Sequence, residues 1–159
     1  MYLYTFIKSL HLLGMIAGFG GVVFTAVVAA RSLKDEQLFK MSPKIISIFS
    51  FIIWGGLILL VVTGVFLEEF WELRGVELEK GSTALMVKKA IVLLIAFHGF
   101  YVNLYLARKM KALAAKDTPF QDPGFRKFKI LGMISTSTSL ILWSGAIILG
   151  IWVSANLML

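Results

Sequence analysis

The sequence contains two histidines, His11 and His98, and each falls inside a long apolar stretch. An ionisable side chain in hydrocarbon is costly, with a lysine or arginine at mid-membrane costing about 3 kcal/mol on insertion scales. A lone histidine there is most often a neutral ring bonded to a hydroxyl or carbonyl of a neighbouring helix. Two histidines on different apolar stretches are also consistent with haem ligation, because neutral imidazole is a standard axial ligand of haem iron. We therefore expect His11 and His98 to ligate one haem b iron from opposite sides.

The residues around His11 are small or basic at a regular spacing. Gly14 and Gly18 follow it by three and seven residues, so they share its helix face and leave that face flat for a porphyrin edge. Close packing against a second helix is the common alternative for such glycines. Lys8 precedes His11 by one turn, and its amine either meets a haem propionate or extends to the membrane interface. We expect Gly14, Gly18 and Lys8 to belong to the cofactor site.

The composition places these residues in a membrane protein. The chain has 159 residues, 58% of them hydrophobic, with a mean hydropathy of +0.86 and a net charge of +7. A soluble domain of this size is not so apolar. The chain has no cysteine, which excludes disulfides, thiolate metal sites and thiol nucleophiles.

Four apolar stretches are long enough to cross about 30 Å of hydrocarbon as helices, at about residues 3–30, 45–67, 85–107 and 129–155. Helices satisfy their own backbone hydrogen bonds in lipid, so these stretches predict an all-α fold. We expect a single domain over residues 1–159, an integral membrane four-helix bundle with up-and-down connections. Pro43 is expected in the first turn of the second helix, where a proline removes no hydrogen bond.

The charges between the stretches predict the orientation of the bundle. The second connection is acidic, with Glu68, Glu69, Glu72, Glu77 and Glu79. The first and third are basic, with Arg31, Lys34, Lys40, Lys44, Arg108, Lys109, Lys111, Lys116, Arg126, Lys127 and Lys129. The positive-inside rule makes the basic connections cytoplasmic and puts both termini outside, across the plasma (inner) membrane. Topology and contact with membrane lipid explain the positive charge, so no nucleic-acid partner is expected.

Two stretches, "FIKSLHLLGMIAGFGGVVF" and "MVKKAIVLLIAFHGFYVNLYLARKM", resemble the HemJ-type membrane protoporphyrinogen oxidases and, more loosely, CopD-type four-helix membrane proteins. HemJ-type proteins show a lysine three residues before a histidine in the first helix and a lysine about ten residues before a histidine in the third. The matching residues here are Lys8 with His11, and Lys88 or Lys89 with His98. The resemblance implies bound haem b, histidine ligation and redox chemistry. The tryptophan and the "YLPR"-type ending of the first HemJ-type helix are absent, and "VVTG" is closer to the CopD-like pattern.

Bis-histidine ligation fills both axial positions of an iron, so we expect electron transfer with a membrane quinone or a redox partner subunit. Three alternatives stay open. The first is a protoporphyrinogen oxidase with substrate near Lys88, Lys89 and Tyr101, because Tyr101 shares the helix face of His98. The second is copper handling, in which Met15 beside His11 supplies a soft thioether. The third is a structural subunit of a respiratory complex, and the glycine-lined helix faces also suit a homodimer.

Overall fold

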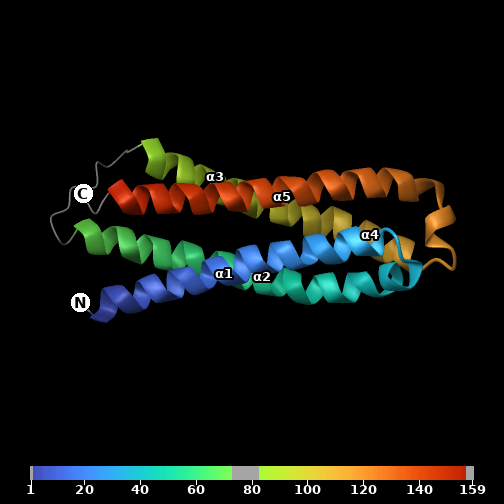
Figure 1. Cartoon of the computed structure of the whole chain (residues 1–159), viewed down its shortest axis with the longest axis horizontal. Coiled ribbons are helices and arrows are strands. Elements are labelled where there is room, and N and C mark those ends of the chain that lie inside the picture. The colour runs from blue at the N-terminus through green and yellow to red at the C-terminus, as the bar shows by residue number, and fades with distance from the viewer. Residues whose placement is uncertain (1, 73–82, 157–159) are drawn as a thin grey trace.

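The computed structural model describes residues 2–72 and 83–156, and the described chain is helical without a strand. The elements are α1 (Tyr2–Ser32), α2 (Glu36–Glu72), α3 (Thr83–Tyr101), the π-helix η1 (Val102–Leu106), α4 (Ala107–Ala114), the 3-10 helix η2 (Pro119–Gln121) and α5 (Pro123–Asn156). Because α3, η1 and α4 form one continuous span, the described chain has four long helical rods. These rods lie side by side (Figure 1). The all-α prediction is confirmed for the described residues.

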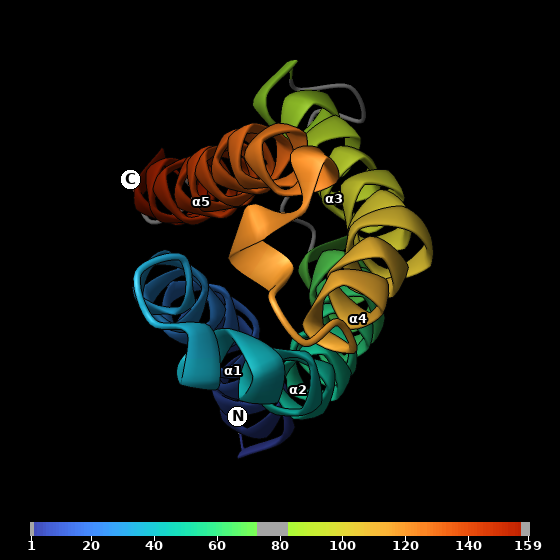
Figure 2. The same ribbon diagram turned by 90° about the vertical axis from the view of Figure 1, so that its right-hand side faces the viewer.

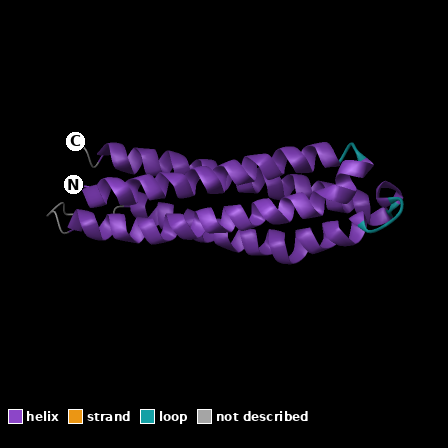
Figure 3. Cartoon of the chain, turned by 90° about the horizontal axis from the view of Figure 1, so that it is seen from below, coloured by secondary structure: helices purple, strands orange, loops and turns teal. Residues whose placement is uncertain are grey.

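Each rod is long and apolar enough to cross a membrane, as expected of a multi-pass membrane protein. The chain runs up and down, so the first and last described residues lie at one end, here called the terminal end (Figures 1 and 3). The opposite end holds the connections 33–35 and 115–122 and is called the basic end. The helices extend beyond their predicted limits there, because polar turns continue α2 and α5 past the apolar stretches.

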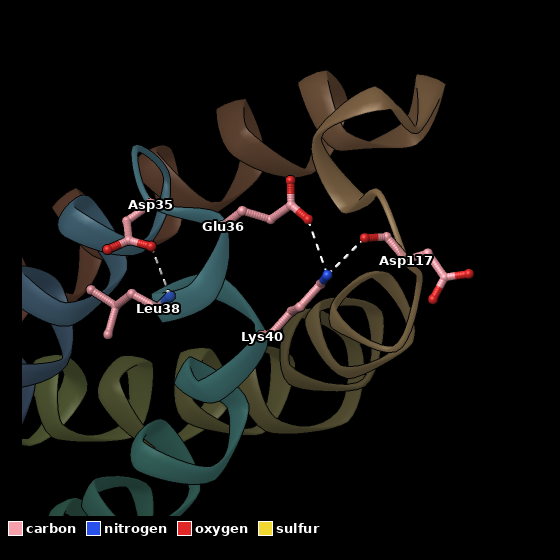
Figure 4. A network of polar contacts seen from close by, with 5 residues as sticks. All are labelled: Asp35, Glu36, Leu38, Lys40 and Asp117. Atoms are coloured by element: carbon pink, nitrogen blue, oxygen red, sulfur yellow. Dashed lines mark hydrogen bonds and ion pairs between the residues drawn. The ribbon is translucent and has the colours of Figure 1, made fainter.

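Pro43 lies inside α2, so the prediction that it sits in the first turn is wrong. The helix begins earlier because Asp35 caps it, its Oδ1 accepting a 3.0 Å hydrogen bond from the Leu38 amide (Figure 4). A proline at position 43 leaves the Phe39 carbonyl without its usual helical donor. The Ser42 hydroxyl donates to that carbonyl at 2.7 Å, so α2 continues through the proline.

The backbones of α1 and α2 approach each other most closely at three glycines. A Cβ built on Gly56 would lie 2.6 Å from the Gly18 amide nitrogen and 2.7 Å from the Gly14 carbonyl oxygen. Helices in lipid associate by close packing rather than by the hydrophobic effect, so small residues at the contact strengthen it. Trp143 of α5 is only 3% exposed and lays its ring on Gly18 from the other side. These contacts join α1, α2 and α5.

An aromatic cluster closes the basic end of the bundle. Phe39 of α2 is fully buried among Phe125 and Phe128 of α5, with ring centroids 5.3 and 6.0 Å away. Lys40 ties α2 to the 115–122 connection, because its Nζ contacts Glu36 Oε1 at 3.0 Å and the Asp117 carbonyl at 2.7 Å (Figure 4). The connection carrying η2 therefore lies across the end of the bundle (Figure 2).

The glycine contact predicts different effects for two adjacent substitutions. Gly56→Ala pushes α1 and α2 apart, because the new methyl group meets backbone atoms that cannot move independently. We expect a loss of about 1–3 kcal/mol in stability, the usual range for overpacking. Gly55→Ala is the matched control, since a Cβ there meets nothing within 4 Å. Thermal unfolding in detergent measures both, and equal effects would contradict the assigned contact.

The contacts of Asp122 at the basic end predict that the stability of the folded protein depends on pH. Its carboxylate pairs with Lys116 and accepts a 2.7 Å hydrogen bond from the Gly124 amide, and Lys116 holds the pKa of Asp122 below its usual range. The pKa of this carboxyl is lower in the folded protein than in the unfolded chain, where it is about 3.9. The carboxylate therefore stabilises the fold fully when the pH is above the pKa of the unfolded chain. This stabilisation is lost as the pH falls through the pKa of the folded protein.

Thermal unfolding between pH 7 and pH 3 tests this dependence. We expect Asp122→Asn to unfold at lower temperature than wild type near neutral pH, with the gap closing below about pH 4. Asp117→Asn is the control, because Lys40 binds the Asp117 backbone carbonyl, which this substitution keeps (Figure 4). A gap that stayed constant down to pH 3 would refute the role of the Asp122 carboxylate.

Candidate functional site

A cavity of about 380 Å³ lies inside the half of the bundle nearer the basic end. It extends from Val22 to Leu33 along α1, eleven residues or roughly 16 Å of helix. All four rods line it. Its walls are mostly apolar, with a few polar groups converging on it from Thr25, Ser50, His98, Asn103, Lys129 and Ser135. Size, apolar walls and a few placed polar groups are the usual properties of a ligand or cofactor site.

His98 contributes its ring to the wall of this cavity. Its Nε2 lies 3.1 Å from the Ser135 carbonyl oxygen and 3.2 Å from the Ser135 hydroxyl of α5. The next residue, Gly99, allows the Trp54 ring of α2 to approach, because a Cβ there would lie 3.1 Å from that ring. The ring of His98 is therefore held between α3 and α5, and Trp54 packs on the neighbouring Gly99.

His11 does not line this cavity and is bonded to α2 instead. Its Nδ1 lies 2.8 Å from Thr63 Oγ1, and the Thr63 hydroxyl donates to the Leu59 carbonyl at 2.5 Å. Since that hydroxyl proton goes to Leu59, the threonine oxygen accepts from His11, and Nδ1 carries the ring proton. Nε2 then holds the lone pair. A histidine whose Nδ1 donates and whose Nε2 keeps its lone pair has the protonation of metal-ligating histidines, and it also suits a proton acceptor.

The structure does not bring the two histidines together. His98 lies at about the height of Trp54 along α2, because Trp54 packs on the neighbouring Gly99. His11 is bonded to Thr63 of the same helix. Trp54 and Thr63 are nine residues apart, which is roughly 13 Å along the helix axis. One iron bound from both faces needs two ring nitrogens about 4 Å apart, since each metal–imidazole bond is about 2 Å. The described arrangement therefore does not fit one iron between these rings. Their joint ligation stays a prediction that requires the bundle to rearrange.

Gly14 and Gly18 have the packing role rather than a place beside a flat cofactor. Their faces are filled by the α2 backbone and by Trp143, which leaves no room there for a porphyrin edge. Lys8 also lies away from the cavity. Its Nζ is 5.9 Å from the Tyr4 ring centroid, one turn nearer the terminal end.

The two lysines of α3 lie with His11, near the terminal end. Lys89 forms a 2.9 Å ion pair with Glu68 of α2, and Lys88 interacts electrostatically with both Glu68 and His11. Tyr101 is twelve residues beyond Lys89, roughly 18 Å along the rod. It is 40% exposed and stacks on Tyr105. The lysines and Tyr101 thus do not form one substrate site, although the sequence suggested one.

Several polar residues of the cavity were not expected from the sequence. Ser50 and Asn103 form a 2.7 Å hydrogen bond in its wall, and Lys129 lines it from α5. One signal could have indicated Asn103, which is the only asparagine in its apolar stretch. The others are common residues that acquire a role only through the partners that the fold places opposite them.

Comparison with known protein families, characterised proteins and solved structures finds no match to this chain. Within residues 2–72 and 83–156, no three His, Asp or Glu side chains gather as a metal-ion site. The functional conclusion therefore depends on the cavity and on the two histidine environments.

The bond between His11 and Thr63 can be tested by a double-mutant cycle. The single variants His11→Phe and Thr63→Val each break the bond, and the double variant removes both partners. We expect a coupling of about 0.6 kcal/mol, the average for hydrogen bonds between membrane helices, and not above about 1.7 kcal/mol, the maximum found for them. Thr63→Ser should keep most of the coupling because it keeps the hydroxyl. Unfolding in mixed detergent gives the energies, and a coupling near zero would reject the bond.

Proposed function

We propose that this protein is a membrane-spanning b-type haem protein for electron transfer, with its haem in the cavity beside His98. The observation that carries the proposal is a partly open cavity of about 380 Å³ between the four rods, with an imidazole in its wall. Facing helices of a bundle are a usual place for haem, and histidine is its commonest ligand. When bound, haem supplies reversible one-electron chemistry.

The residues around the cavity fit such a group. Ser135 offers His98 a carbonyl acceptor, which leaves the other ring nitrogen for a metal. Trp54 and Trp143 supply flat apolar walls, and Lys129 supplies a cation for a propionate. The resemblance of the first and third apolar stretches to HemJ-type proteins also supports haem. The proposal differs from the sequence hypothesis in assigning His98, and not His11, to the iron, so that electron transfer is proposed from the one-electron chemistry of haem and no longer from ligation by two histidines.

We further propose that the basic end faces the cytoplasm and that the protein lies in the plasma membrane. The support is the excess of lysine and arginine at that end, since such residues are retained on the cytoplasmic side. The cavity would then lie in the half of the protein that faces the inner leaflet. Electron partners would approach from the inner leaflet or from a subunit packed against the bundle.

Absorption spectra of detergent-purified protein, oxidised and reduced, test the proposal. We expect haem b bands in the wild type and at least a tenfold lower haem content in His98→Ala, because the variant lacks the axial ligand. His11→Ala is the matched control, since His11 does not line the cavity, and it should keep its haem.

The other outcomes also decide between hypotheses. Loss of haem in both variants would favour the bis-histidine site over the one proposed here. Retention in both would reject histidine ligation. A colourless wild-type protein that does not take up added haem would reject haem binding altogether.

A further inference from the structure

A second, smaller pocket of about 180 Å³ lies on the side of the central cavity where α2 meets η1 and α4. It is lined by Pro43, Ile46, Ser47, Ser50, Asn103, Ala107 and Met110. Ser50 and Asn103 also line the central cavity, so their hydrogen-bonded pair lies between the two spaces. Ser47 is exposed and makes no described hydrogen bond, so its hydroxyl is available at the pocket.

The π-helix places Asn103 in this wall. The Ala107 amide bonds to the Val102 carbonyl, five residues back, so the turn carries one residue more than an α-helical turn. Such π-helical turns are frequent at functional sites. The Asn103 Oδ1 accepts a 2.7 Å bond from the Ser50 hydroxyl, while the amide nitrogen has no partner among the described residues. Every fully buried side-chain nitrogen or oxygen described does have one, so this nitrogen is not fully buried, and Asn103 lines both pockets.

Unused amide donors in an apolar region are costly, and a ligand with an acceptor atom removes that cost. The residues lining the pocket carry no charge, which favours a neutral ligand. Lys44 and Arg108, next in sequence to pocket residues, mark the level of the membrane interface. Ser50 is six residues deeper than Lys44, roughly 9 Å into the hydrocarbon. The pocket therefore suits a small polar head on an apolar tail.

We propose that this pocket binds the head group of a lipid-soluble quinone. The Asn103 amide and the Ser47 hydroxyl donate to the quinone carbonyl oxygens, and the isoprenoid tail remains in the bilayer. A phospholipid head is the less suitable occupant, because its phosphate would require a cation in the lining. The inference rests on the proposed function in that the quinone would be the electron partner of the haem. Quinone binding itself requires only the pocket.

Binding of decylubiquinone to the purified protein, followed by quenching of tryptophan fluorescence, tests the site. We expect saturable binding to the wild type and about tenfold weaker binding to Asn103→Leu, which keeps the side-chain size and loses the amide. Ser47→Ala should weaken binding less. Thr138→Ala is the control, since its hydroxyl bonds the Ile134 carbonyl on α5 and lines neither pocket, and it should bind as the wild type does.

Haem content is measured in the same samples, so that a failure of the haem proposal can be distinguished from a failure of the quinone proposal. Colourless protein that binds quinone in an Asn103-dependent way would overturn the haem proposal and support this inference. Haem-loaded protein with unchanged quinone affinity in Asn103→Leu would overturn this inference alone. Displacement of the quinone by phosphatidylglycerol, together with loss of binding in Lys44→Gln/Arg108→Gln, would assign the pocket to a phospholipid and overturn it as well.

Discussion

The close contact between the backbones of α1 and α2 at Gly14, Gly18 and Gly56 is the constraint on which the rest of the bundle depends. Lipid gives helices no hydrophobic reason to associate, so they are held by packing that only small residues permit. Once these backbones touch, the register of α1 against α2 is set, and His11 lies opposite Thr63. Trp143 then occupies the remaining space beside Gly18 and brings α5 against α1.

The same contact explains why space remains elsewhere. Towards the basic end, hydroxyl, amide and imidazole groups line the interior, and the aromatic cluster around Phe39 and the η2 connection close that end. The bundle is packed closely at the glycines, and a partly open cavity lies between the four rods in the half nearer the basic end. The walls of this cavity are held by helix contacts at both ends.

Polar side chains inside the bundle act mainly in pairs between neighbouring rods. His11 bonds to Thr63, His98 to Ser135, and Ser50 to Asn103. Each pair replaces the water that these groups would otherwise bind, which lets them remain in an apolar region. The pairs lie at different levels, so the chain has separate polar sites, one histidine near Lys88 and the other in the cavity.

The sequence by itself determined the four apolar helices, their up-and-down order and the concentration of positive charge at one end, because hydropathy and charge act residue by residue. It also identified both histidines as the polar groups of greatest interest. It misplaced Pro43, since the rescue of the Phe39 carbonyl by Ser42 depends on local geometry. Only the tertiary structure decided the level of each histidine, the packing role of the glycines and the place of Asn103 in a π-helical turn. These depend on the register between helices, which arises from side chains distant in sequence fitting against one another.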